Sequence, residues 1–89
     1  MAATAPAWGV AYSPSTNGCY IEFWTAAWNA QCSSATKAGK YQAHVDYNNQ
    51  PDYTGPWVTR ARNWSGCFDS GEAWFNVQGA NTYVSYTAS

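Results

Sequence analysis

The sequence contains no leucine, although leucine is the usual filler of helical cores. Aromatic residues take its place, with seven tyrosines, six tryptophans and three phenylalanines in 89 residues. Aromatic and β-branched side chains favour the pleated surface of a sheet, and each ring can bury about 150–250 Å². The missing leucine therefore argues against a helical bundle, and the abundant rings predict a small all-β domain.

Charge is also scarce, since charged residues make up 10% of the chain and the net charge is −1. Only four residues are basic, which is too few for the series of phosphate contacts that nucleic-acid binding needs. No apolar run approaches the roughly 20 residues of a membrane-spanning helix. We therefore expect neither a nucleic-acid partner nor a membrane span.

Motifs of catalysis and metal binding are missing as well. The sequence has no G-x-S-x-G, P-loop or H-E-x-x-H motif. Its single histidine, His44, stands among polar residues and is interpreted as a surface side chain. Glu22 and Glu72 are the one carboxylate pair that glycoside hydrolysis could use, but glutamates on strands ordinarily serve solubility. We expect no enzymatic activity, metal site or cofactor, and keep a small hydrolase as the least favoured alternative.

The three cysteines, Cys19, Cys32 and Cys67, lack the C-x-x-C spacing of a metal site. A disulfide compensates for the small core of a domain this short, and it persists in oxidising compartments. We predict a Cys19–Cys32 disulfide, with Cys32–Cys67 as the alternative. Closing a loop of about 15 residues contributes about 3 kcal/mol in the chain-entropy model. Cys67 is then expected to be buried or to link two chains.

The first seven residues are small and resemble the end of a cleaved signal peptide. We expect residues 1–7 to be a flexible segment of a single domain that spans residues 1–89. Together with the predicted disulfide, this segment indicates a secreted or cell-surface protein.

Alternation of inward and outward residues with period two predicts antiparallel strands. The strand candidates are 19–24, 40–47, 57–62, 72–78 and 82–87, with 8–12 as a sixth. The stretch 25–38 is left open between a short helix and a loop. The predicted fold is a small antiparallel β-sandwich or barrel of about five to six strands.

The inward phase of segments 40–47 and 72–78 predicts part of the core. Tyr41, Val45, Phe75 and Val77 occupy this phase and are expected to be buried. Loss of the Phe75 ring from a core would cost about 3–5 kcal/mol of folding free energy.

The outward phase of segments 19–24, 72–78 and 82–87 predicts a ligand-binding surface. It carries four rings, Tyr20, Trp24, Trp74 and Tyr83, with polar residues beside them. Exposed rings stack on the apolar face of a sugar or serve as hot spots in protein interfaces. The structural alternative is that both faces of the sheet are covered and these rings belong to the core.

These observations favour a secreted, non-enzymatic binding module that recognises a carbohydrate or cell-envelope glycan through surface aromatics. The alternative function is a secreted protein-binding agent, such as an enzyme inhibitor, a toxin component or a self-assembling surface subunit. The expected partner is thus a glycan or an extracellular protein. Self-association is expected through Cys67 or through exposed aromatic rings.

Overall fold

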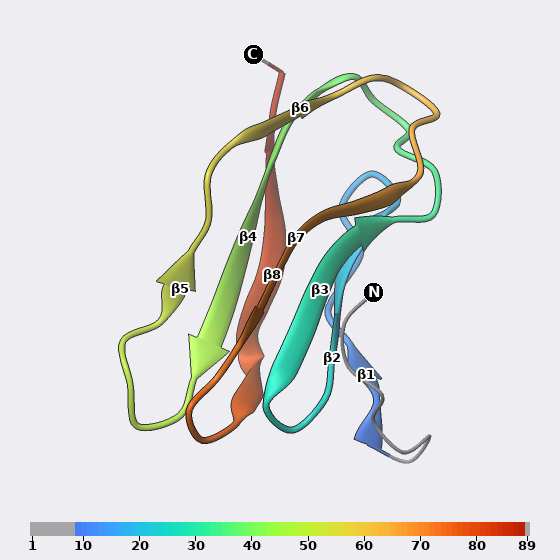
Figure 1. Ribbon diagram of the computed structural model, residues 1–89. Helices are drawn as coiled ribbons and strands as arrows, with labels where there is room; N and C mark the ends of the chain where they lie inside the picture. Colours follow the sequence, from blue (N-terminus) through green and yellow to red (C-terminus); the bar gives the residue numbers. More distant parts are fainter. Residues whose placement is uncertain (1–8, 89) are drawn as a thin grey trace.

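A computed structural model describes residues 9–88 of the chain. Within this range the chain forms eight β-strands and no α-helix, and the strands make two antiparallel sheets (Figure 1). The all-β sandwich is confirmed, whereas the expected number of about five to six strands is too low. The segment 1–7, expected to be flexible, lies outside the described residues.

One sheet, called the β3 sheet below, has the strand order β1-β2-β3-β7. Its strands are β1 (Ala11–Tyr12), β2 (Cys19–Phe23), β3 (Ala27–Cys32) and β7 (Gly66–Glu72). A tight turn at Asn17 and Gly18 precedes β2, and both residues have positive φ angles of 52° and 83°. Asn-Gly suits such a turn because both residues tolerate the left-handed region.

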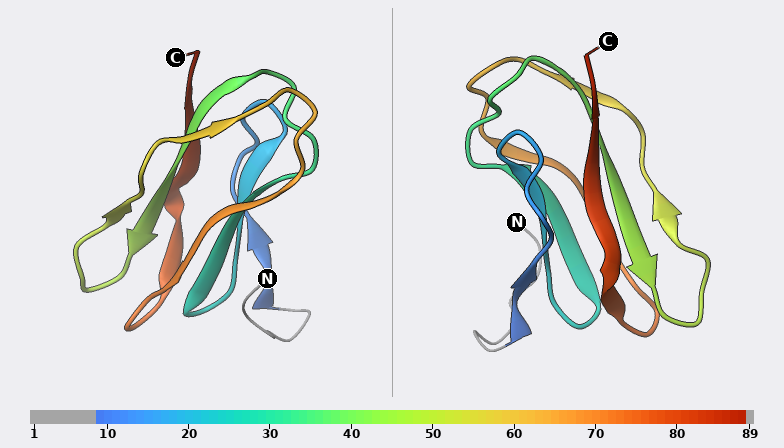
Figure 2. Two further views of the ribbon diagram at one scale, coloured as in Figure 1. Left: turned by 45° about the horizontal axis from the view of Figure 1, so that its top comes forward. Right: turned by 180° about the vertical axis from the view of Figure 1, so that it is seen from behind.

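The other sheet, called the β4 sheet, is built around the nine-residue strand β4 (Gly39–Tyr47). The long strand β8 (Val77–Thr87) pairs with one edge of β4. The short strands β5 (Tyr53–Thr54) and β6 (Val58–Arg60) pair with its other edge. Figure 2 shows the same division from two further directions, with β8 beside β4 and β2 beside β3.

Three strands lie where the sequence predicted none: the two-residue strand β5 and the longer strands β3 and β7. Residues 25–38, left open between helix and loop, contain β3, and the turn-like stretch 66–72 forms β7. Each of these strands finds its partner in the other, in a register that runs from Ala27 opposite Glu72 to Cys32 opposite Gly66. Period two is obscured in β3 because the register shifts between Ala30 and Gln31.

The Cys19–Cys32 disulfide is confirmed. The two cysteines stand directly opposite each other on β2 and β3, with their Cα atoms 3.9 Å apart. Cys67 is a free cysteine on β7 and is exposed. The expectation that it would be buried is therefore wrong, because β7 is an edge strand and Cys67 lies away from the core.

Trp28 links the two sheets at the centre of the core. Its side chain is fully buried, and its indole Nε1 donates a hydrogen bond of 2.8 Å to the Tyr47 hydroxyl on β4. Its ring packs against Tyr53 of β5 with centroids 5.2 Å apart. The Tyr53 hydroxyl in turn donates to Asp69 Oδ2 of β7 at 3.0 Å. Burial, followed by the Asp69 carboxylate, raises the pKa of Tyr53 to about 12.

Gly71 lies opposite Trp28 in the β3–β7 pair. A Cβ atom at this position would lie 2.8 Å from Trp28 Cζ2 and 2.9 Å from Nε1. The sequence Asp69-Ser70-Gly71 has the composition of a turn, but here the glycine leaves room for the indole ring. A strand glycine that admits a neighbouring ring cannot be distinguished from a turn glycine by sequence alone.

The predicted core is confirmed at Tyr41, Val45 and Val77, which are all buried. It is wrong at Phe75, which is 55% exposed. Phe75 lies in the loop between the end of β7 at Glu72 and the start of β8 at Val77. The alternation over 72–78 therefore joined the ends of two strands across a loop.

We predict that Gly71→Ala destabilises the protein by about 1–3 kcal/mol, the usual cost of overpacking. The added methyl would press on Trp28, which is buried and hydrogen-bonded and cannot move away freely. Urea unfolding measures the change. The control is Ser70→Ala at the exposed neighbouring position, expected to change stability by about 0.5 kcal/mol or less. An unchanged midpoint for Gly71→Ala would show that the indole ring is loosely held.

We further predict opposite outcomes for two aromatic truncations. Trp28→Ala should cost about 3–5 kcal/mol, because it empties the centre of the core. Phe75→Ala should cost about 0.5 kcal/mol or less, because its ring is exposed in a loop. Thermal melts of both variants compare them directly. A large loss of stability in Phe75→Ala would restore the original assignment of this ring to the core.

Candidate functional site

The structure distributes the four predicted ligand-contacting rings over three places. Tyr20 lies on the outer face of the β3 sheet, because its neighbours Cys19 and Ile21 are buried. Tyr83 lies on the outer face of the β4 sheet, beside the buried Val84. These two faces look away from each other, so one small ligand cannot touch both rings.

Tyr20 is engaged with its own sheet. Its hydroxyl accepts a hydrogen bond of 2.9 Å from Gln31 Nε2 and one of 3.3 Å from Ser33 Oγ. Its ring meets the edge of Tyr12 with centroids 5.8 Å apart. These contacts hold the ring of Tyr20 against the sheet and leave it half-buried.

Trp24 and Trp74 lie in loops at one end of the sandwich, called the loop end here. It consists of residues 24–26, 48–52 and 73–76, the connections β2–β3, β4–β5 and β7–β8 at the bottom of Figure 1. Trp24 is half-buried, whereas Trp74 is 80% exposed. The loop end thus combines two of the four predicted rings and adds the exposed ring of Phe75.

Hydrogen bonds between the loops fix the position of Trp74. Its backbone amide donates to Gln50 Oε1 at 2.6 Å, and the preceding Ala73 amide donates to Ala26 O at 2.8 Å. Two residues after Trp74 in the sequence, Asn76 Oδ1 accepts a hydrogen bond of 2.9 Å from Asn48 Nδ2. The exposed indole therefore projects from a loop whose backbone is held on both sides.

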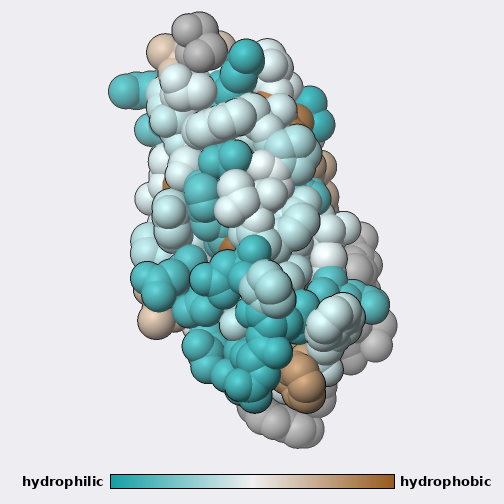
Figure 3. All heavy atoms as spheres, turned by 90° about the vertical axis from the view of Figure 1, so that its left-hand side faces the viewer, coloured by the Kyte–Doolittle hydropathy of each residue, from teal (hydrophilic) through white to brown (hydrophobic). Residues whose placement is uncertain are grey.

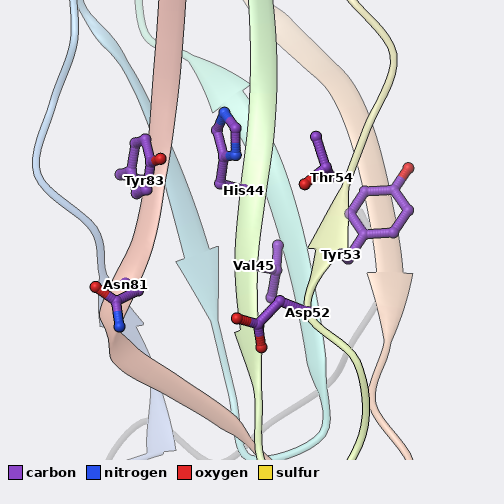
Figure 4. A pocket seen from close by; sticks show the side chains of 7 residues that line it. All are labelled: His44, Val45, Asp52, Tyr53, Thr54, Asn81 and Tyr83. Atoms are coloured by element: carbon purple, nitrogen blue, oxygen red, sulfur yellow. The ribbon is translucent and has the colours of Figure 1, made fainter.

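The outer face of the β4 sheet carries a pocket of about 270 Å³ (Figure 4). Strand β4 forms its floor, with β5 on one side and β8 on the other. The residues that line it are His44, Val45, Asp52, Tyr53, Thr54, Asn81 and Tyr83. Figure 3 views the side of the molecule on which β5 lies, and hydrophilic side chains gather over its lower half.

A stacked pair of rings forms one wall of the pocket. His44 and Tyr83 stand opposite each other in the β4–β8 register, with ring centroids 4.4 Å apart and planes 10° apart. His44 Nε2 lies 2.8 Å from Ser85 Oγ. Desolvation by burial lowers the pKa of His44, so the imidazole is neutral at neutral pH. Tyr83 remains 43% exposed.

Polar groups surround the ring pair. Thr54 of β5 stands opposite His44 on the edge of β4 away from Tyr83. Asp52, in the loop before β5, accepts a hydrogen bond of 3.1 Å from the Tyr47 amide through Oδ1. Asn81 lies at the irregular stretch of β8, where the register shifts opposite His44 and Asp46. A hydroxyl, a carboxylate and an amide thus face one hollow beside two rings (Figure 4).

The irregular stretch of β8 positions Asn81. The sequence Gly79-Ala80-Asn81 has the composition of a turn, but it lies inside β8. The neighbouring Thr82 hydroxyl completes the hydrogen bonding there: it accepts from the Asp46 amide at 3.0 Å and donates to Gln78 O at 2.6 Å. The Thr82 hydroxyl thus provides hydrogen-bond partners for the backbone at this bulge. The bulge places Asn81 beside the pocket.

The predicted ligand set contained Tyr83 but missed His44, Asp52, Thr54 and Asn81. The alternation over 40–47 does place His44 on the outward phase, where it was interpreted as a solvated surface residue. Which strand lies beside it cannot be read from that alternation. The ring stack depends on the pairing of β4 with β8 across a long sequence separation.

Ser85 and His44 resemble the first two members of a nucleophilic site, but such a site also needs a group that orients the histidine. Among residues 9–88, the hydrogen bond to Ser85 is the one that the His44 side chain makes. Glu22 and Glu72 lie on β2 and β7, separated by β3, and neither lines the pocket.

The described part of the chain contains neither a cluster of metal-ligating side chains nor a membrane-spanning helix. In residues 9–88, no three His, Cys, Asp or Glu side chains come together as a metal site would require. The same residues include no helix long and apolar enough to cross a membrane. No protein-family model matches the chain, and no curated protein or solved structure is significantly similar to it.

We predict that the NMR titration of His44 has a midpoint below about 6.5, the ordinary histidine pKa. The resonance is unambiguous because the chain has a single histidine. Since folding lowers this pKa, the unfolded chain binds the proton more readily. Stability should therefore fall as the pH drops from about 6.5 through the lowered pKa. His44→Gln should remove this part of the acid dependence, and a midpoint at or above the ordinary value would contradict it.

Proposed function

We propose that the protein is a non-enzymatic binding module that holds a carbohydrate in the His44–Tyr83 pocket. One observation carries the proposal: a single hollow of about 270 Å³ combines a stacked ring pair with a carboxylate, an amide and a hydroxyl. Ligand sites typically join aromatic walls to a few polar groups that fix orientation. The pocket has this composition on a small scale.

The chemistry of the pocket suits a sugar ring. A pyranose has apolar C–H faces, which pack on aromatic rings, and hydroxyls around its edge, which exchange hydrogen bonds. The neutral imidazole of His44, backed by Tyr83, supplies a flat uncharged surface. Asp52, Thr54 and Asn81 supply acceptors and donors around it. The volume lies just below the roughly 300–1,000 Å³ of drug-sized sites, which suits one sugar residue of a longer glycan.

The disulfide supports a secreted or cell-surface location. Disulfides such as Cys19–Cys32 form and persist in oxidising environments outside the cytosol. Glycans of cell envelopes and extracellular matrices occur in the same environments. The proposed location and the proposed ligand class are therefore consistent with each other.

Recognition of an extracellular protein is the alternative function, and the loop end supports it. Trp74 is 80% exposed on a loop held by neighbouring loops. Tryptophan is enriched among interface hot spots. A loop whose backbone is already held in place loses less conformational entropy on binding. Trp74 does not line the pocket, so the alternative can be tested independently.

The test begins with a glycan array and continues with calorimetry on the best ligand. Tyr83→Ala should weaken binding at least about tenfold, which corresponds to roughly 1.4 kcal/mol, because it removes the exposed ring of the pocket wall. Asp52→Asn should weaken binding too, since it removes the charged acceptor. Thermal melts verify that both variants are folded.

The matched control is Trp74→Ala, an exposed ring outside the pocket. It should leave glycan affinity unchanged. Loss of binding in Trp74→Ala with full binding in Tyr83→Ala would move the glycan site to the loop end. A parent protein that binds no glycan on the array would overturn the carbohydrate proposal in favour of a protein partner.

A further inference from the structure

The basic side chains gather at one end of the molecule. Lys37 lies in the loop before β4, Lys40 is the second residue of β4, and Arg60 ends β6. The β4–β6 register places Gly39 opposite Arg60, and Arg62 follows two residues later. Lysine and arginine number four in the whole chain. All of them therefore lie at this end, called the basic end, at the top of Figure 1.

The carboxylates lie mainly toward the opposite end. Glu22 is next to last in β2, Asp46 is next to last in β4, and Glu72 ends β7. All three strands reach the loop end at these residues, where the rings of Trp74 and Phe75 are exposed. We call this region, with its three carboxylates and two rings, the acidic end. Asp52 stands nearby and lines the pocket, whereas Asp69 lies within β7.

The side chain of Arg60 contacts neutral groups of its own chain. Arg60 donates to Thr59 O at 2.9 Å and lies over the Trp64 ring, 4.5 Å from its centroid. The longest axis of the molecule is 34 Å. This exceeds the Debye length of about 8 Å at physiological ionic strength several times over. The two ends therefore present their charges separately to anything that approaches.

We infer that the protein associates with itself head to tail, the acidic end of one copy binding the basic end of the next. Both halves of a complementary pair occur on the same chain. The acidic end carries two exposed rings together with carboxylates, and protein interfaces combine aromatic centres with polar rims. The basic end offers cations and the Arg60–Trp64 pair. Because the two contacting surfaces differ, the contact is heterologous and repeats into a ring or an open filament.

Such an assembly would leave the carbohydrate pocket accessible. The pocket lies on the outer face of the β4 sheet, alongside the axis that joins the two ends (Figures 1 and 4). Successive copies would present their pockets in a row. A row of weak sites binds a repetitive glycan far more tightly than one site does. Self-association is inferred from the charges and rings at the two ends and does not depend on the carbohydrate proposal.

Sedimentation velocity on charge-reversed variants tests the inference. One variant, Lys37→Glu/Arg62→Glu, cancels the net positive charge of the basic end, and the other, Glu22→Lys/Glu72→Lys, makes the acidic end basic. The four positions avoid Arg60, which stacks on Trp64, and avoid the pocket residues. All proteins carry Cys67→Ser, so that a disulfide dimer through the free cysteine is excluded. Lys37→Arg/Arg62→Lys is the charge-preserving control.

The parent and the control should associate with increasing protein concentration at about 0.02 M salt. Their apparent Kd should rise at least about tenfold at about 0.5 M salt, where surface charges are screened. Each reversed variant alone should be monomeric, because its two ends no longer attract each other. An equimolar mixture of the two reversed variants should associate again, and thermal melts should show both to be folded.

Several results would overturn the inference. The parent protein could stay monomeric at low salt, or association could persist at high salt or in either reversed variant. The equimolar mixture could also stay monomeric while the parent associates. Glycan binding by the monomeric reversed variants should be unchanged per site, because their substitutions lie outside the pocket. That measurement separates a failure of self-association from a failure of the carbohydrate proposal.

Discussion

The indole of Trp28 is the contact on which the rest of the sandwich depends. It leaves the β3 sheet, fills the space between the layers, and ends in a hydrogen bond to Tyr47 of the β4 sheet. Tyr53 packs beside it and extends the connection to Asp69. A chain without leucine has few large aliphatic side chains to distribute over a core. One large ring that is both packed and hydrogen-bonded therefore joins layers that many aliphatic residues would otherwise join.

This arrangement dictates which residues can face the ring. Gly71 must lack a side chain because the indole occupies the volume where its Cβ would extend. On β4, the buried Tyr41, Ala43 and Val45 face the same interior, and the alternation of the strand then sends His44 to the outer face. The position of the pocket is thus a consequence of the packing of the core. The side of β4 opposite the core is where its polar residues meet those of β5 and β8.

The pocket, the exposed rings and the positive charges lie on different parts of the molecule. The pocket occupies an outer face, the exposed rings occupy the loop end, and the positive charges occupy the opposite end. In a chain with so little charge, each charged residue has a large influence on the surface potential around it. Val45 of the core and Tyr53, which packs against it, also line the pocket, so the pocket is built directly on the packed interior.

The amino-acid sequence by itself determined the class of fold, the face that each regular strand buries, and the disulfide. Period two along 40–47 is a local property, and it correctly assigned Tyr41 and Val45 to the core and His44 to the surface. Local signals failed where partners decide. Glycine, serine and aspartate in 66–72 are typical of a turn, but the segment forms a strand because it pairs with β3. Phe75 matches the pattern of a core residue, but it lies in the loop between β7 and β8.

Only the tertiary structure decided which outward rings share a surface. Tyr20 and Tyr83 occupy the same phase of alternation, yet they belong to different sheets and face opposite directions. His44 meets Tyr83 because β4 pairs with β8, and all four basic residues meet at one end because β6 returns to the start of β4. Alternation fixes the side of a strand on which a residue lies. The neighbour across the gap is fixed by long-range pairing, which minimises the free energy of the whole chain and leaves no local mark in the sequence.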